Sequence, residues 1–149
     1  MMTSDRNIYQ TARISSGLTQ ERAAELIGVS VRSLAAYEGG ERIPADDVIV
    51  RMADVYNTQF LAYQHLRNTM EAARSVLPDV TPQSLAEAVL RLQKEINDFL
   101  QIRDTLIEIA CDGVITDEEQ PLWEKCLKEA DEVGRAVTAL KFAIVKAAG

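Results

Sequence analysis

Cysteine is nearly absent from this 149-residue sequence, which contains only Cys111 and Cys126. No Cys-x-x-Cys pair occurs, and one histidine, His65, cannot complete a zinc site with them, so we expect buried thiols, no disulfide and no bound metal. The sequence also lacks an apolar run of about 18 residues, and MMTSDRNIYQ at its start is not a signal peptide. These absences predict a cytoplasmic protein with no membrane partner.

Basic residues are in the minority, with 16 Lys and Arg against 23 Asp and Glu and a net charge of −7. This balance argues against a broad basic surface that coats nucleic acid. No glycine-rich phosphate loop, recognisable carboxylate pair or nucleophile arrangement accompanies His65. We therefore expect no catalytic residues and no cofactor, and we interpret His65 as a packed or surface histidine.

Glycine and proline are scarce, and they fall between segments in which apolar residues recur every three or four positions. This periodicity predicts an all-α protein. Only the stretch LPDVTP, residues 77–82, holds two prolines close together. We place a domain boundary there, giving domains 1–77 and 78–149.

The first domain is predicted to contain five helices, over residues 5–15, 20–27, 31–38, 44–56 and 59–76, the last interrupted near residues 68–69. Thr19 and Ser30 are the expected N-caps of the second and third helices. The apolar spacing assigns these residues to the core: Ile8, Ala12, Ile14, Ala23, Ala24, Ile27, Val48, Ile49, Met52, Ala53, Leu61, Leu66, Met70 and Ala73.

The second domain is predicted to be a long antiparallel helical hairpin. Its first helix begins with Thr81 as cap and Pro82 at the first position, and runs to about Cys111; Thr116 and Glu119 form a capping box before the second. A lone hairpin cannot cover both of its faces, so we expect a homodimer whose four helices form a bundle. Trp123 and Phe142 are assigned to packing or to the interface. The expected dimerisation residues are Leu85, Val89, Leu92, Ile96, Phe99, Leu106, Val133, Val137, Leu140 and Ile144.

Residues 20–38, QERAAELIGVSVRSLAAYE, place two short helices on either side of a tight turn that contains Gly28. This spacing is typical of a helix-turn-helix, in which the second helix enters the DNA major groove. Its outer side would carry Ser30, Val31, Arg32, Ser33 and Ala36. A simple corner between two helices in a structural protein has the same pattern, so periodicity alone leaves both interpretations open.

The stretch GLTQERAAELIGVSVRSLAAYEGGERIP resembles the phage-repressor type helix-turn-helix of the XRE family of regulators. The resemblance covers about residues 8–66 and implies a five-helix, lambda-repressor-like domain that binds operator DNA as a dimer. It also implies that Gln20 and Ser30 contact phosphates, that residues 31–33 face the groove, and that Arg13 pairs with Glu38 inside the domain.

The sequence departs from the family where many relatives carry Asn-Gly-Lys, because Gly39, Gly40 and Glu41 stand there. An acid thus replaces a cation directed at phosphate. Arg22, Arg32 and Arg42 remain candidate DNA contacts. The turn DGVITDEE, residues 112–119, echoes half of an EF-hand loop, but Ala110 would fall on a ligand position, so helix termination and capping explain it better.

Together these features predict a sequence-specific, repressor-like transcriptional regulator of a phage or mobile element that binds double-stranded operator DNA, and not an enzyme. Two alternatives stay open: an adaptor whose helix-turn-helix has little DNA affinity, and a switch that senses an unidentified small molecule through the C-terminal bundle.

Overall fold

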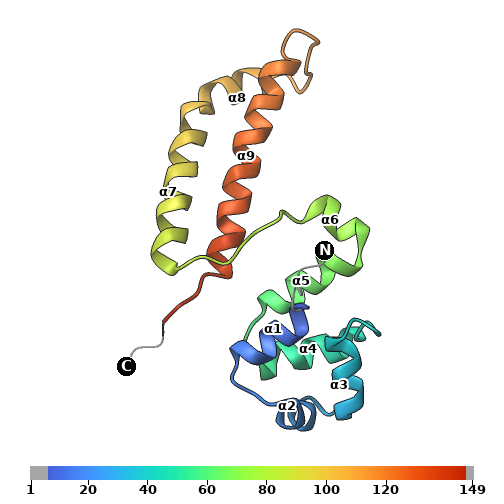
Figure 1. The fold of residues 1–149 in the computed structure, drawn as a ribbon. Helices are drawn as coiled ribbons and strands as arrows, with labels where there is room; N and C mark the ends of the chain where they lie inside the picture. Colours follow the sequence, from blue (N-terminus) through green and yellow to red (C-terminus); the bar gives the residue numbers. More distant parts are fainter. Residues whose placement is uncertain (1–6, 147–149) are drawn as a thin grey trace, which may run out of the picture. The chain divides into compact units, whose positions relative to one another are not determined.

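The computed structural model describes residues 7–146, and apart from one isolated bridge every regular element in that range is an α-helix. The predicted all-α class is therefore confirmed. The chain divides into two compact units, residues 1–77 and 78–149 (Figure 1). Across the described residues, none of the helices combines the length and the hydropathy that crossing a bilayer requires.

The N-terminal unit contains α1 (Ile8–Ser15), α2 (Gln20–Ile27), α3 (Val31–Glu38), α4 (Asp46–Val55), α5 (Phe60–Thr69) and the short α6 (Glu71–Val76). The predicted bounds of α2 and α3 are confirmed, as is the interruption that separates α5 from α6. The start predicted at Pro44 is two residues early, because Ala45 is the N-cap of α4. The first residues of the helix predicted over 5–15 lie outside the described range.

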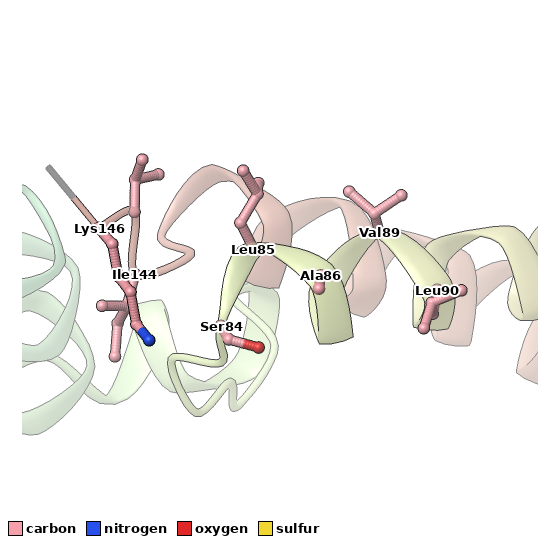
Figure 2. A pocket seen from close by; sticks show the side chains of 8 residues that line it. Ser84, Leu85, Ala86, Val89, Leu90, Ile144 and Lys146 are labelled. Carbon is pink, nitrogen blue, oxygen red and sulfur yellow. The ribbon is translucent and has the colours of Figure 1, made fainter. Parts of the chain in front are cut away.

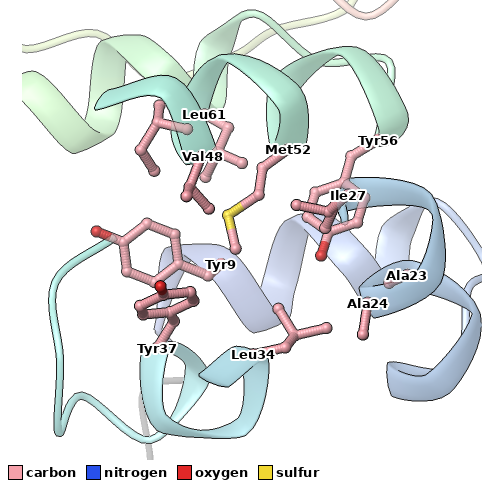
Figure 3. Packing of buried hydrophobic residues seen from close by; sticks show 11 residues of the cluster. Tyr9, Ala23, Ala24, Ile27, Leu34, Tyr37, Val48, Met52, Tyr56 and Leu61 are labelled. Carbon is pink, nitrogen blue, oxygen red and sulfur yellow. The ribbon is translucent and has the colours of Figure 1, made fainter. Parts of the chain in front are cut away.

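The core of this unit gathers side chains from α1 to α5 around Met52, which points into the centre of the cluster (Figure 3). Ala23 and Ala24 are 0% and 1% exposed, so α2 approaches its neighbours closely. Ile27, Leu34 and Leu61 are also almost completely buried. Each large apolar side chain buried in this way contributes about 1.5–3 kcal/mol.

Two of the predicted core positions are wrong. Ile14 is 42% exposed, because α1 directs Tyr9 and Arg13 inward, four residues apart, and Ile14 falls beside that stripe. Met70 is 52% exposed, because it lies between α5 and α6 with an extended backbone, where helical periodicity no longer applies.

The C-terminal unit contains α7 (Leu85–Gln101), α8 (Arg103–Ala110) and α9 (Gln120–Lys141). The helix start predicted at Thr81 and Pro82 is wrong, because Ser84 caps α7 and forms a capping box with Glu87. The single first helix predicted up to Cys111 is also interrupted at Ile102, where the backbone leaves the helical region. The predicted hydrogen bonds between Thr116 and Glu119 form, one turn before α9 begins.

Helices α7 and α9 lie side by side and form the two arms of the hairpin (Figure 1). Their contact buries small residues, among them Ala88, Ala136 and Ala139. Beyond α9 the chain returns to the start of α7. The backbone N–H of Ile144 donates to the carbonyl of Gln83 at 2.8 Å, and the N–H of Leu85 donates to the carbonyl of Ile144 at 3.3 Å.

Candidate nucleic-acid interface

The turn between α2 and α3 is built by local interactions. Gly28 ends α2 with a φ of 80°, a left-handed conformation that favours glycine. Two residues later, the hydroxyl of Ser30 accepts a hydrogen bond from the backbone N–H of Ser33 at 3.0 Å and so caps α3. Thr19 caps α2 in the same way through the N–H of Arg22. These caps and this glycine fix the two helix ends that a helix-turn-helix requires.

A buried ion pair fixes the far end of α3. The side chains of Arg13 and Glu38 are 10% and 2% exposed, and Arg13 donates from Nε and Nη2 to the two Glu38 oxygens at 2.5 and 2.9 Å. Arg13 Nη1 also donates to the carbonyl of Leu18 at 2.7 Å. Its hydrogen bonds to Glu38 raise the pKa of Arg13, so the guanidinium stays charged. The pair ties α1 to the last residue of α3.

Gln20, which the family resemblance assigns to phosphate binding, joins this pair. Its amide Nε2 donates to Glu38 Oε2 at 2.8 Å, which leaves one N–H of the amide for any phosphate. The contact links the first residue of α2 with the last residue of α3. The orientation of α3 is therefore set at both ends.

Arg51 and Asn7 also brace these helices, and the sequence pattern did not reveal either of them. Arg51 on α4 donates from Nε to the carbonyl of Ile27 at 2.8 Å, satisfying the end of α2, and pairs with Asp47 at 2.9 Å. The amide of Asn7 donates to the carbonyl of Tyr37 near the end of α3. Asn7 is also the N-cap of α1, because its side-chain oxygen accepts from the N–H of Gln10 at 3.1 Å. The bonds of Asn7 to Tyr37 and of Arg51 to Ile27 reach distant helices, so no local signal announces them.

The outer side of α3 is accessible. Val31 is 40% exposed and Arg32 is exposed, while Ser33 and Ala36 are half-buried. Arg32, Ser33 and Ala36 line a cleft of about 480 Å³ together with Ala35, Glu41 and Arg42. The cleft thus brings together three of the predicted groove residues, Arg32, Ser33 and Ala36, while Ser30 and Val31 are exposed at the start of α3 and do not line it.

Arg42 and Arg22, two of the candidate DNA contacts, differ in the interactions that their guanidinium groups make within the domain. The guanidinium of Arg42 lies 5.8 Å from the centre of the Tyr37 ring, a cation–π distance that orients it beside the cleft. Arg22 pairs with Glu25 at 2.7 Å, but both side chains are more than half exposed, so the pair is weak. Arg22 can therefore exchange this partner for a phosphate.

His65 does not lie at this surface. It is 6% exposed, and its Nδ1 lies 2.9 Å from the hydroxyl of Tyr9. Burial lowers the pKa of His65 and is partly opposed by the carboxylate of Asp46. Burial also raises the pKa of Tyr9, so burial favours the neutral forms of both partners in this hydrogen bond.

Eight of the residues predicted for dimerisation lie on α7 and α9, the two arms of the hairpin, whereas Leu106 lies on α8. The placement of Ile144 on the second helix is wrong, because α9 ends at Lys141 and the chain then turns back to the start of α7. Those with the greatest exposure are Leu85, Val89, Ile96, Val137 and Ile144, between 39% and 61% exposed. Leu92, Phe99, Leu106, Val133 and Leu140 are half-buried. Leu85 and Val89 project from the same side of α7 beside a hollow of about 940 Å³ that Leu90 and Ile144 also line (Figure 2).

An acidic cluster that the sequence pattern did not suggest lies on the hairpin. Carboxylate oxygens of Glu95, Asp98 and Glu129 lie within 4.8 Å of one another, and Glu95 is only 7% exposed. The ammonium of Lys94 pairs with Asp98 at 2.8 Å and with Glu95 at 3.4 Å. The hydrogen bond to Asp98, followed by that to Glu95, raises the pKa of Lys94, so a lysine already neutralises part of this cluster.

Comparison with known proteins agrees with this geometry. A model of the protein family described as "Helix-turn-helix" matches residues 10–61 of the chain. The chain is also 28% identical over 117 residues to the HTH-type transcriptional regulator ImmR of Bacillus subtilis (strain 168), an alignment that covers 78% of this chain and 83% of that protein. No solved structure matches the chain significantly. The resemblance seen in the sequence is confirmed over residues 10–61, the part of the chain that matches the helix-turn-helix family.

Proposed function

We propose that this chain is a transcriptional regulator of the repressor type, which binds a two-fold symmetric operator as a homodimer. The observation that carries the proposal is the exposed surface of α3, which presents Val31, Arg32 and Ser33 from a helix clamped at both ends. The family match and the similarity to a regulator support it. In this function the chain binds DNA and catalyses no reaction.

Arg32 is the side chain on which sequence choice would chiefly depend. A guanidinium at the start of a recognition helix can donate to N7 and O6 of guanine, which discriminates against other bases by about 1–3 kcal/mol. Val31 would contact a thymine methyl group, and Ser33 would supply an adaptable hydroxyl. Ser30, Gln20, Arg22 and Arg42 would then hold phosphates and fix the register.

The charge distribution sets limits on affinity. The net charge is −7, and Glu41 lies in the cleft beside Arg42, where it would repel a phosphate. Non-specific binding should therefore be weak, and specific binding would depend on base contacts more than on a general attraction to DNA.

Dimerisation through the C-terminal unit is supported by the apolar side chains that the single chain leaves exposed. Leu85, Val89 and Ile96 follow one another on α7 at steps of four and seven, so they share one face of that helix. Val137 is exposed on α9, and Ile144 is exposed beyond the end of that helix, beside the start of α7. A second copy of the hairpin would cover these side chains and would hold two α3 helices in one assembly.

Selection of bound fragments from a random DNA pool, followed by titration at several salt concentrations, tests the proposal. We expect a half-site repeated with two-fold symmetry, and an affinity for it that falls as salt rises. The Arg32→Ala variant should bind the selected site more weakly by about 1–3 kcal/mol. Its affinity for mismatched sites should be unchanged.

Arg103→Ala, which removes an exposed arginine on α8, is the matched control and should leave both affinities unchanged. Equal weakening on every sequence would assign Arg32 to phosphate instead. If no DNA is selected at any salt concentration, the chain is an adaptor and the proposal fails.

A further inference from the structure

A small polar cavity lies at the open end of the hairpin, within the C-terminal unit. Its volume is about 150 Å³, and its polar lining consists of Asp79, Thr81, Gln83, Arg91 and Arg135. Arg91 comes from α7 and Arg135 from α9. The first residues of the unit thus meet both arms of the hairpin here.

The two arginines of the cavity are not satisfied by the carboxylate of Glu132. Arg91 Nη2 and Arg135 Nε each lie 4.0 Å from Oε2 of Glu132. An N–H···O hydrogen bond requires about 2.7–3.2 Å, so neither guanidinium donates to Glu132 from these atoms. The carboxylate attracts both charges without a directional bond to either.

Two buried polar atoms at the same place lack partners. Among the residues that the structure describes, Nε of Arg135 and Oε1 of Gln83 are shielded from solvent and make no hydrogen bond. Buried polar groups are nearly always paired with protein, water or a ligand. An unpaired donor and an unpaired acceptor that line one cavity indicate an occupant that can both accept and donate.

We propose that this cavity binds a small oxyanion, either phosphate or a short carboxylate. Its oxygens would accept hydrogen bonds from Arg135 Nε and from the guanidinium of Arg91, because a planar guanidinium matches both kinds of anion. The side-chain amide of Gln83 can contact the ligand in two ways. Its oxygen accepts from a protonated ligand oxygen, or, if the amide rotates by 180°, its NH2 group donates to a charged ligand oxygen.

The size and the charge of the cavity fit a weakly bound ion. At about 30 Å³ for each water molecule, the space holds one small anion and a little solvent. Asp79 and Glu132 offset the two arginines in formal charge, so we expect a Kd on the order of millimolar. A bound anion would fasten residues 79–83 to α7 and α9 and would stabilise the C-terminal unit. This inference does not depend on DNA binding.

Thermal unfolding of the full chain tests the proposal. Trp123 is the one tryptophan and lies on α9, so its fluorescence reports on the C-terminal unit. In sodium phosphate at about ten times its Kd, the Tm should rise by on the order of 5 °C above that in sodium chloride of equal ionic strength. Malonate is tested in parallel, and the ion giving the larger rise identifies the preferred oxyanion.

Variants separate a bound ion from the general stabilisation that phosphate gives to proteins. Arg135→Gln and Arg91→Gln should each abolish the rise, Arg103→Gln should retain it, and Asp79→Asn should enlarge it. Arg91 is exposed, so Arg91→Gln decides the matter if Arg135→Gln folds poorly. An equal rise in Arg91→Gln and the unaltered protein, or no rise over chloride with either anion, would overturn the proposal.

Discussion

Replacement of Glu38 by alanine should strongly destabilise the N-terminal unit. Glu38 accepts hydrogen bonds from Nε and Nη2 of Arg13 and from Nε2 of Gln20, and its side chain is 2% exposed. Without it, the largely buried guanidinium of Arg13, only 10% exposed, keeps its hydrogen bond to the carbonyl of Leu18 but loses its carboxylate partner. Leaving one buried charge unpaired costs about 3–5 kcal/mol.

This loss is large compared with the stability of a small domain, about 5–15 kcal/mol. Glu38→Gln keeps the shape but removes the charge, so it should cost less, about 1.5–3 kcal/mol. Replacing both partners with apolar residues, as in Arg13→Met with Glu38→Leu, should recover much of the loss because no buried charge then remains. Glu41→Ala, three residues away and exposed, should change stability by no more than about 0.5 kcal/mol.

Urea unfolding of the full chain can measure these effects because the aromatic residues divide between the units. All four tyrosines lie in residues 1–77 and the one tryptophan lies in α9. The tyrosine signal in near-UV circular dichroism should shift to lower urea in Glu38→Ala, while the Trp123 fluorescence transition stays in place. If Glu38→Ala and Glu41→Ala shift the tyrosine transition equally, the ion pair does not hold α3 and the reasoning is refuted.

Three further outcomes are expected. Burial lowers the pKa of His65 below its usual value near 6.5, so the unfolded chain takes up a proton that the folded chain does not; stability should fall as the pH drops below about 6.5, and His65→Gln should flatten this dependence of the urea midpoint. A fragment that ends at Leu77 should be monomeric in light scattering while the full chain is dimeric, and a dimeric fragment would move the interface elsewhere. Cys126 is buried as expected, but the expectation that Cys111 is buried is wrong, because it is exposed where α8 ends; thiol titration should therefore find both free after denaturation but only Cys111 reactive beforehand, and finding neither thiol after denaturation without reductant would contradict this.

The sequence predicts α2, the turn and α3 closely because their boundaries depend on short-range interactions. Gly28 and Ser30 act on the residues next to them, so their effect is readable from spacing. The start of α7 is harder, because Thr81 with Pro82 and Ser84 with Glu87 both form plausible helix beginnings. The structure uses the second, since the backbone of residues 83–85 is hydrogen-bonded to Ile144, a partner distant in sequence.

The candidate site shows the same division between local and distant effects. The exposed row of α3 follows from its helical period, and the grouping of residues 31–33 could be predicted. The contact of Gln20 with Glu38 and that of Arg51 with the carbonyl of Ile27 depend on how separate helices pack. A polar side chain that satisfies a distant group has no periodic signature, so sequence spacing alone does not reveal it.

The backbone hydrogen bonds between Ile144 and residues 83–85 bring the entry and the exit of the C-terminal unit to the same place. A unit whose chain enters and leaves at neighbouring points can be inserted into a loop of another protein with little distortion of the host. The hairpin should therefore tolerate transfer into a loop of a host protein. Residues 83–85 and Ile144 already hold its two points of attachment side by side.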